Sequence, residues 1–201
     1  MINTEKAIQI IKESHGIISA SQAFKAGIAP KTFYAMRDQG ILVPVSRGIY
    51  RLQVVEPLIY PDMITVSLRI PKAVICLISA LHYYNLTEQI PYFVYIALPQ
   101  QSEMPHLDYP PLKIIWPSEK IYQAGIKEVL FDSIKVRIYS SEKTITDCFK
   151  FRNKYGLDVA IDALKRYMAL PSNKQDFDSL MHFARLNRVE KIITPYIESL
   201  Q

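Results

Sequence analysis

Apolar residues recur at helical spacing at the start of the chain. Within residues 4–14 they fall at Ala7, Ile8, Ile10 and Ile11, and Gly16 follows as a helix stop. Gln9 lies between them, and charged residues flank them on both sides. This pattern predicts an amphipathic helix over residues 4–14.

A second, shorter helix is predicted directly afterwards. Ser19 can cap its start, and Gln22, three residues later, completes a capping box. Gly27 suits the position after the helix, where a positive φ is wanted. Pro30 then fits the first position of a third helix, because proline lacks the N–H that would be unsatisfied there. Gly40 ends this helix.

The third helix has an apolar face, and a hairpin follows it. Phe33 and Met36 fall on the same side of a helical wheel. Residues 41–46 and 48–53 then read as two short strands joined at Ser46–Arg47–Gly48, with Pro44 acceptable only on an edge strand. Three helices followed by a two-stranded hairpin predict a winged helix-turn-helix domain over residues 1–54.

The rest of the chain predicts a larger mixed domain over residues 55–201. Residues 54–62 hold two prolines and little periodicity, which is typical of a linker or docking segment. Several runs rich in β-branched and aromatic residues predict strands at residues 92–99, 112–117, 129–131 and 134–140. Helical spacing predicts helices at residues 73–86, 141–151, 158–168, 177–184 and 189–200. The predicted fold class is therefore α/β (α+β).

The charge of the chain is concentrated near its N-terminus. Residues 1–54 contain seven basic and three acidic residues, a net charge of +4, while the other 147 residues contain 17 basic and 16 acidic residues. A basic domain attached to a nearly neutral one suggests a polyanionic partner. The alternative interpretation is an ordinary solvated surface.

The N-terminal sequence does not look like a targeting segment. Its apolar positions are interrupted by four charged residues, Glu5, Lys6, Lys12 and Glu13. No apolar run approaches the roughly 18 residues that a membrane span needs. Cys76 and Cys148 match no metal or redox spacing and are expected to be reduced core thiols. We expect a cytoplasmic protein without membrane contacts.

Catalytic motifs are not evident in the sequence. It contains no Gly-rich phosphate loop, no zinc-ligand spacing and no G-x-S-x-G elbow. A nuclease-like pattern can be drawn through Glu128, Asp132 and Lys135, but the acid–x–lysine unit of such sites is missing. We therefore expect a protein that is not an enzyme and that uses no cofactor or metal.

The basic residues of the winged helix are better candidates for function. In this fold the third helix enters the DNA major groove, and the hairpin contacts the neighbouring backbone or minor groove. Lys31 lies beside the positive end of the predicted helix dipole, and Arg47 lies at the wing tip. The residues expected to contact DNA are Ser21, Gln22, Lys31, Thr32, Tyr34, Arg37, Arg47, Gly48, Tyr50 and Arg51. Alternatively, Tyr34 and Arg37 simply cover the surface of the domain.

Residues 16–52, GIISASQAFKAGIAPKTFYAMRDQGILVPVSRGIYRL, carry a family resemblance. They resemble the N-terminal domain of the AbiEi antitoxin family of bacterial type IV toxin–antitoxin systems. That domain has an apolar helix, a short helix ending in A-G-I, a basic helix, G-x-L, and a wing with R-G-x-Y. Residues 79–99 and 138–168 are similar to later segments of the family, so the resemblance covers roughly residues 3–170.

The resemblance implies a transcriptional regulator that is also an antitoxin. Such a protein would bind its own promoter DNA and oppose a nucleotidyltransferase-like toxin, with or without direct contact. The C-terminal domain would carry the antitoxic role. Further contacts to DNA or to a partner would come from a basic cluster, Lys143, Lys150, Arg152 and Lys154, whose alternative interpretation is a solvated helix face.

The sequence departs from the family in the third helix. Ala29 stands where a small hydroxyl residue usually precedes this helix, and Ala35 and Asp38 make its outward face less basic. We therefore expect more of the affinity to come from the wing and the C-terminal domain than from this helix. Two other functions remain open on the sequence: a winged-helix module that docks a protein rather than DNA, and a nuclease with a winged-helix targeting domain.

Overall fold

The chain divides into two compact units in a computed structural model that describes residues 3–14, 16–53, 59–131 and 134–200. The N-terminal unit comprises Met1–Pro71, Leu107–Pro110 and Leu130–Val136. The C-terminal unit comprises the remaining segments, 72–106, 111–129 and 137–201. The boundary predicted between residues 54 and 55 lies outside the described residues and stays a prediction.

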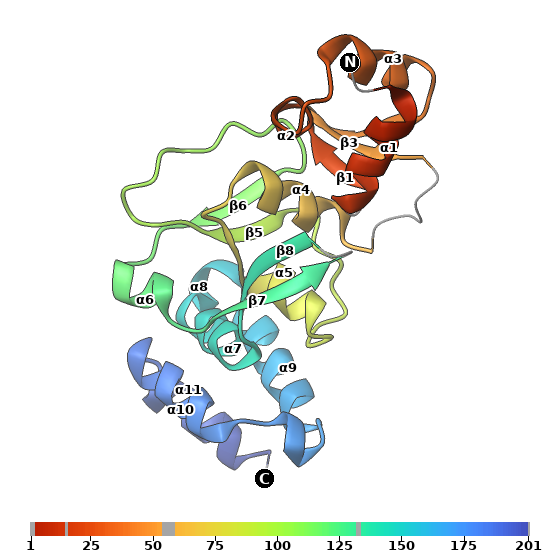
Figure 1. Cartoon of the computed structure of the whole chain (residues 1–201). Helices are drawn as coiled ribbons and strands as arrows, with labels where there is room; N and C mark the ends of the chain where they lie inside the picture. The colour runs from red at the N-terminus through yellow and green to blue at the C-terminus, as the bar shows by residue number, and fades with distance from the viewer. Residues whose placement is uncertain (1–2, 15, 54–58, 132–133, 201) are drawn as a thin grey trace. The chain divides into compact units, whose positions relative to one another are not determined.

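The N-terminal unit has the helices and hairpin of a winged helix (Figure 1). In chain order its elements are α1 (Thr4–Glu13), β1 (Ile17–Ser19), α2 (Ala20–Lys25), α3 (Pro30–Asp38), β2 (Leu42–Ser46), β3 (Ile49–Leu52) and α4 (Pro61–Arg69). The three strands form an antiparallel sheet in the order β1-β3-β2. Pro44 therefore lies on an edge strand, as expected. The sequence did not predict β1 or α4.

Local sequence explains where the short helices begin. The Ser19 hydroxyl accepts a hydrogen bond from the Gln22 N–H at 3.1 Å, and the Ser19 N–H donates to the Gln22 side chain at 3.0 Å. This is the predicted capping box of α2. Helix α3 begins with Pro30 in its first turn and has Ala29 at its N-cap.

The core of the N-terminal unit lies between its helices and its small sheet. Phe33 and Met36 of α3 are fully buried, as their shared position on the wheel predicts. The residues of this core are Ala7, Ile11, Ile18, Ala23, Ile28, Phe33, Met36, Leu42 and Leu52. Burial of this cluster fixes α3 by its inner face and leaves the opposite face exposed.

The larger part of the chain is a mixed sheet with helices. The elements in chain order are β4 (Val74–Ile75), α5 (Leu77–Tyr83), β5 (Val94–Ala97), β6 (Leu112–Ile115), α6 (Glu119–Gln123), β7 (Ile126–Phe131), β8 (Ile134–Tyr139), α7 (Ser141–Lys150), α8 (Arg152–Tyr155), α9 (Leu157–Met168), a 3-10 turn (Ser172–Lys174), α10 (Phe177–Leu186) and α11 (Glu190–Glu198). Its strand order is β6-β5-β4-β8-β7. Strand β4 pairs antiparallel to β5 and parallel to β8. The predicted α/β (α+β) fold class is confirmed.

One predicted helix is wrong in its first residues. Residues 73–86 were expected to form a single helix, but strand β4 comes first and α5 begins at Leu77. Leu77 has a positive φ of 46°, so the chain makes a sharp turn there. A short apolar run fits a buried strand or a buried helix equally well, which is why periodicity missed the change.

Helix α7 is the central helix of the C-terminal unit. It packs against α5, α9, α10 and α11, and its residues from Glu142 to Phe149 are all buried. Gly125 approaches it closely: a Cβ on Gly125 would lie 2.8 Å from the Cβ of Lys143. Its φ of +76° also favours glycine.

Candidate nucleic-acid interface

The outward face of α3 is exposed and carries a cation in its first turn. Lys31 and Ala35 are exposed, and Tyr34 retains 39% of its accessible surface. The positive end of a helix dipole lies in this first turn and adds to the field of the Lys31 ammonium. A phosphate or an electronegative base edge placed here would meet both.

Arg37, on the flank of α3, is engaged within its own helix. Its Nη2 lies 2.7 Å from Asp38 Oδ1, and its Nε donates to the same oxygen at 2.8 Å. The hydrogen bond to Asp38 raises the pKa of Arg37, and the guanidinium carbon lies 4.9 Å from the centre of the Tyr34 ring. Arg37 would have to exchange Asp38 for a phosphate in order to bind DNA.

The wing tip places Arg47 in solvent. Its side chain is 84% exposed, and its Nη1 lies 3.7 Å from Oδ2 of Asp108, which is 82% exposed. Gly48, the next residue, has a φ of +78°, a value that favours glycine. The Gly48 carbonyl accepts a hydrogen bond from the N–H of Ala20 at 2.9 Å, which ties the tip to the start of α2.

Sequence reasoning missed two residues at this tip. The Nη1 of Arg69, in the last turn of α4, donates to the Arg47 carbonyl at 3.0 Å. Asp108 reaches Arg47 from a segment about sixty positions later in the chain, so no local pattern linked them. Pro61 followed by apolar residues at Met63, Ile64 and Val66 is a pattern from which α4 could have been predicted.

Tyr50 and Arg51 lie on β3, the central strand of the small sheet. Tyr50 is half-buried, and its ring meets Phe33 edge to face at 5.1 Å between centroids. Arg51 is half-buried and lies opposite Ile17 on β1 and Val43 on β2. Both residues are thus part of the wing itself and set back from its tip.

The remaining predicted residues of the winged helix lie on α2 and α3. Ser21 and Gln22 are exposed, and Thr32 is half-buried. The side-chain oxygen of Gln22 serves the capping box, which leaves its amide NH₂ as the group that could donate to a phosphate. Whether any of these ten residues touches DNA stays a prediction.

The charge is distributed differently from what the linear sequence suggested. The N-terminal unit, counted with its two later segments, contains nine basic and seven acidic residues, a net charge of +2. The C-terminal unit contains 15 basic and 12 acidic residues, a net charge of +3. The argument for a polyanionic partner therefore rests on where Lys31 and Arg47 lie rather than on net charge.

The prediction of a basic surface that includes Lys143 is corrected by the structure. Lys143 retains 1% of its accessible surface, and its Nζ lies 2.5 Å from Asp147 Oδ1. Helices α5, α9 and α10 pack around α7, and Lys143 is among the α7 residues that they bury. Lys143 therefore cannot contact DNA or a partner at the surface.

The other three residues of that cluster remain nearer the surface. Lys150 and Lys154 are exposed, and Arg152 is half-buried with its Nη1 donating to the Phe149 carbonyl at 2.9 Å. They lie at the end of α7 and on α8. A role for them in contacts to DNA or a partner stays a prediction.

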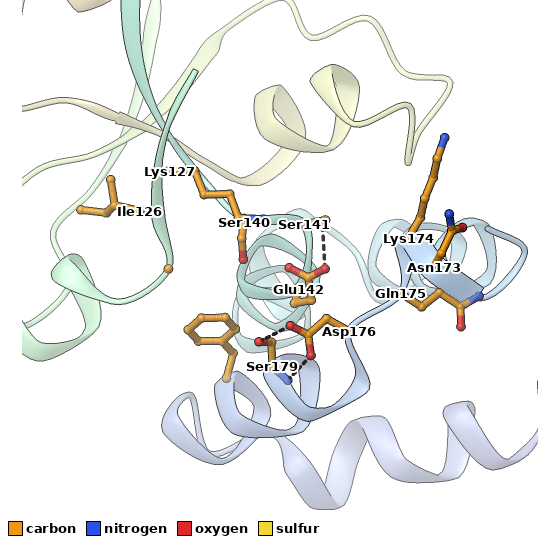
Figure 2. Close-up of a pocket in the computed structure, with 12 residues that line it drawn as sticks. Ile126, Lys127, Ser140, Ser141, Glu142, Asn173, Lys174, Gln175, Asp176 and Ser179 are labelled. Atoms are coloured by element: carbon orange, nitrogen blue, oxygen red, sulfur yellow. Dashed lines mark hydrogen bonds between the residues drawn. The ribbon is translucent and has the colours of Figure 1, made fainter. Parts of the chain in front are cut away.

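A polar pocket of about 360 Å³ lies in the C-terminal unit (Figure 2). Asp176 caps α10 by accepting from the N–H and the hydroxyl of Ser179 at 2.9 and 2.7 Å. Glu142 accepts from the Ser141 hydroxyl at 2.9 Å and from the Tyr167 hydroxyl at 3.0 Å. These hydrogen bonds give the acidic groups of the pocket a structural role at the starts of α7 and α10.

Metal-ligating side chains do not gather in groups of three or more within the described part of the chain. Asp132, one member of the nuclease-like pattern, lies outside the described residues. Cys76 and Cys148 are buried, as expected, and burial raises the pKa of both thiols. Such thiols are poor nucleophiles and poor metal ligands.

A family model matches the winged-helix segment. Residues 5–53 match a family described as "Transcriptional regulator, AbiEi antitoxin", so the resemblance seen in the sequence is confirmed over these residues. The match supports a regulator role in a toxin–antitoxin system. No curated protein matches the chain. Among the helices that the structure describes, none has the length and apolar character to span a membrane.

Proposed function

We propose that the protein is a transcriptional regulator whose N-terminal unit binds double-stranded promoter DNA upstream of its own gene. Helix α3 would enter the major groove, and the β2–β3 hairpin would contact the adjacent backbone or minor groove. The observation that carries this proposal is the exposure of two cations on the two elements that such a domain uses, Lys31 on α3 and Arg47 at the wing tip.

The anchoring of these elements supports the proposal. Phe33 and Met36 hold the inner face of α3 in the core, so its outer face is presented in a fixed orientation. The hydrogen bonds from Ala20 and Arg69 to the wing tip hold the backbone around Arg47 in place. An anchored backbone needs no ordering on binding, which favours affinity.

We propose further that the protein is the antitoxin of a type IV system and acts in the cytoplasm. It would oppose a nucleotidyltransferase-like toxin encoded beside it, with the C-terminal unit carrying this role. The family description of residues 5–53 supports the proposal. The proposed role is one of binding, without catalysis, cofactor or membrane.

Titration of the full chain against its own upstream DNA tests the first proposal. Fluorescence anisotropy with a promoter duplex and a scrambled duplex, each over a series of salt concentrations, would measure affinity and its salt dependence. We expect tighter binding to the promoter and a steep loss of affinity with salt, because phosphate contacts release counterions. Equal, salt-insensitive binding to both duplexes would contradict it.

Co-expression with the neighbouring gene product tests the antitoxin role separately. We expect the full chain to restore growth of cells that express a nucleotidyltransferase-like toxin. A variant with both Lys31→Ala and Arg47→Ala should lose promoter binding yet still restore growth if the C-terminal unit carries the antitoxic role. Loss of both properties together would place the antitoxic role in the winged helix.

One observation favours a second candidate function, a winged helix that docks a protein. The outward side of α3 carries an internal ion pair between Arg37 and Asp38 next to the exposed ring of Tyr34. Such a mixture of aromatic and paired ionic side chains also suits a protein partner. Absence of salt-dependent DNA binding, with a partner that is lost on Tyr34→Ala, would favour this alternative.

A further inference from the structure

A second cavity of the C-terminal unit differs from the polar pocket of Figure 2. It has a volume of about 230 Å³ and lies between α7 and the segment that follows β6. Lys143, Asp147 and Lys150 of α7 line it, and their spacing of four and three residues places them on one side of the helix. The aromatic residues Trp116 and Tyr139 also line it.

The interior of this cavity contains a carboxylate that is only half satisfied. Asp147 retains 1% of its accessible surface, and its Oδ1 accepts from Lys143 Nζ at 2.5 Å and from Asn187 Nδ2 at 2.8 Å. Its Oδ2 is buried and has no hydrogen-bond partner among the residues that the structure describes. A buried, unpaired carboxylate oxygen is costly, so a donor is expected to reach it.

The ammonium group of Lys143 has its partners inside the protein, so Lys150 is the cation of α7 that a ligand in the cavity can reach. The Nζ of Lys143 lies 4.5 Å from the centre of the Tyr139 ring as well as against Asp147. Lys150 is exposed, and burial of part of its side chain lowers its pKa. The Asp147 carboxylate opposes this shift, while the nearby cations Lys143 and Arg188 add to it. An anion beside Lys150 would relieve this repulsion between cations.

Aromatic side chains form part of the cavity wall, which suits a flat ring. Trp116 lines the cavity and is 39% exposed, so part of its ring is available for stacking. Tyr139 of β8 and Phe151, which directly follows α7, add apolar surface. The volume of 230 Å³ is smaller than the roughly 300–1,000 Å³ of sites for drug-sized ligands. The space fits one ring system with its substituents left in solvent.

We propose that this cavity binds a small organic anion that carries a planar ring with an N–H or amino donor, the chemical class that includes nucleoside monophosphates. The ring stacks on Trp116, and the anionic group lies against Lys150. Asp147 Oδ2 is closed to solvent, so the cavity wall shifts slightly to let the ring's donor reach it. The residues that line this cavity all belong to the C-terminal unit, so none of them is part of the winged helix. Lys150 is also one of the residues considered above for a secondary contact to DNA or a partner.

The chain provides its own reporter for the test. Trp116 is the one tryptophan in the sequence, so intrinsic fluorescence reports on this cavity. The full chain would be titrated with AMP, GMP, CMP and UMP, with the matching nucleosides, and with inorganic phosphate. N-acetyltryptophanamide would correct for absorption by the ligands, and isothermal titration calorimetry would confirm each binding curve.

We expect a saturable change with at least one monophosphate and binding about tenfold weaker for its nucleoside, since a charge-assisted hydrogen bond is lost. Inorganic phosphate should bind more weakly still because it cannot stack on Trp116. Phosphate binding as tight as the monophosphate would overturn the requirement for a ring. No saturable change with any nucleotide would mean that the cavity holds water only, and would overturn the proposal.

Two variants locate the binding within the cavity. Lys150→Gln should weaken monophosphate binding about tenfold and leave nucleoside binding unchanged. The matched control is Lys154→Gln, which removes an exposed charge from α8, outside the residues that line the cavity. Equal binding by Lys150→Gln and wild type would contradict the assignment. Because Lys150 is exposed, this variant avoids the risk that a change at Asp147 unfolds the protein.

Discussion

At the residue scale, the wing tip brings together charges that the sequence keeps far apart. Arg47 lies against Asp108 while its carbonyl holds Arg69. The side chains of Arg47 and Asp108 are both more than 80% exposed. An ion pair so exposed contributes only about 0–1 kcal/mol to stability. Its greater consequence is for binding, because Asp108 occupies the position beside Arg47 that a phosphate would take.

Replacing this carboxylate should therefore improve DNA binding. We expect Asp108→Asn to raise affinity for promoter and scrambled DNA alike by about two- to fivefold, since no ion pair must be broken and a repulsive charge is removed. Anisotropy titrations at low salt would measure the change. The control is Glu103→Gln, which removes another exposed carboxylate from the same stretch of chain. Equal gains in both variants would show an effect of net charge alone.

At the residue scale, the buried ion pair of α7 differs from the exposed pair at the wing tip, because its loss affects stability. Lys143 and Asp147 are nearly inaccessible, and Asn187 donates to the same carboxylate. Breaking such a pair from one side leaves an uncompensated charge in the core. The hydrogen bond from Asn187, at the end of α10, connects this pair to that helix.

Removal of the lysine from this pair should be strongly destabilising. We expect Lys143→Ala to lower the free energy of unfolding by about 3–5 kcal/mol, because Asp147 would remain buried without its cation. Urea denaturation followed by circular dichroism would measure the loss. Lys150→Ala, on the same helix but exposed, should change stability by less than about 0.5 kcal/mol. Similar losses in the two variants would contradict the structural role of the pair.

At the element scale, the sequence predicted the winged helix well because its signals are local. The capping box of Ser19 and Gln22 and the apolar side of Phe33 and Met36 each depend on a few neighbouring residues. Strand β1, with only three residues from Ile17 to Ser19, is too short to show a period. It forms because β3 offers it an antiparallel partner, which is a tertiary effect.

The wrong prediction that Lys143 lies on the surface also has a tertiary cause. The sequence predicted the helix itself at residues 141–151, and the structure has it at Ser141–Lys150. What could not be predicted is that α5, α9 and α10 cover it on several sides, because this depends on elements from distant parts of the chain. A lysine followed four residues later by an aspartate looks the same on a solvated helix as on a buried one.

Helix α3 offers a prediction at this scale. Ala29 occupies its N-cap with extended dihedral angles but has no oxygen to accept a hydrogen bond from the first turn. We expect Ala29→Ser to stabilise the protein by about 0.5–1 kcal/mol. The control is Ala35→Ser, in the exposed interior of the same helix, which should cost a few tenths of a kcal/mol. Thermal unfolding measures both, and a loss at Ala29→Ser would argue against this N-cap.

At the scale of the whole molecule, the compact units do not follow the order of the chain. The N-terminal unit includes Leu107–Pro110 and Leu130–Val136, which lie far beyond the winged helix in sequence. Within this unit, Tyr109 donates a hydrogen bond to Asp62 at 3.3 Å, and the ring of Tyr60 packs at a tilt against that of Phe131. A truncation after the wing would remove Arg69 and Asp108, which both contact Arg47, so point substitutions are the cleaner test of DNA binding.

The pair Lys31 and Arg47 provides that test for the whole molecule. If each contacts a phosphate, each single alanine variant should reduce the slope of log affinity against log salt by about 0.9, and the double variant by about twice as much. The two residues lie on different elements, so their effects should be nearly additive. Arg47→Ala should weaken promoter and scrambled duplexes equally, whereas Lys31→Ala should also reduce the preference for the promoter if it reaches a base edge, where one good contact discriminates by about 1–3 kcal/mol. Salt titrations of the four proteins on both duplexes would measure this. A double variant with the wild-type slope and affinity would mean that α3 and the wing present an ordinary solvated surface, and the protein-docking function would then be favoured.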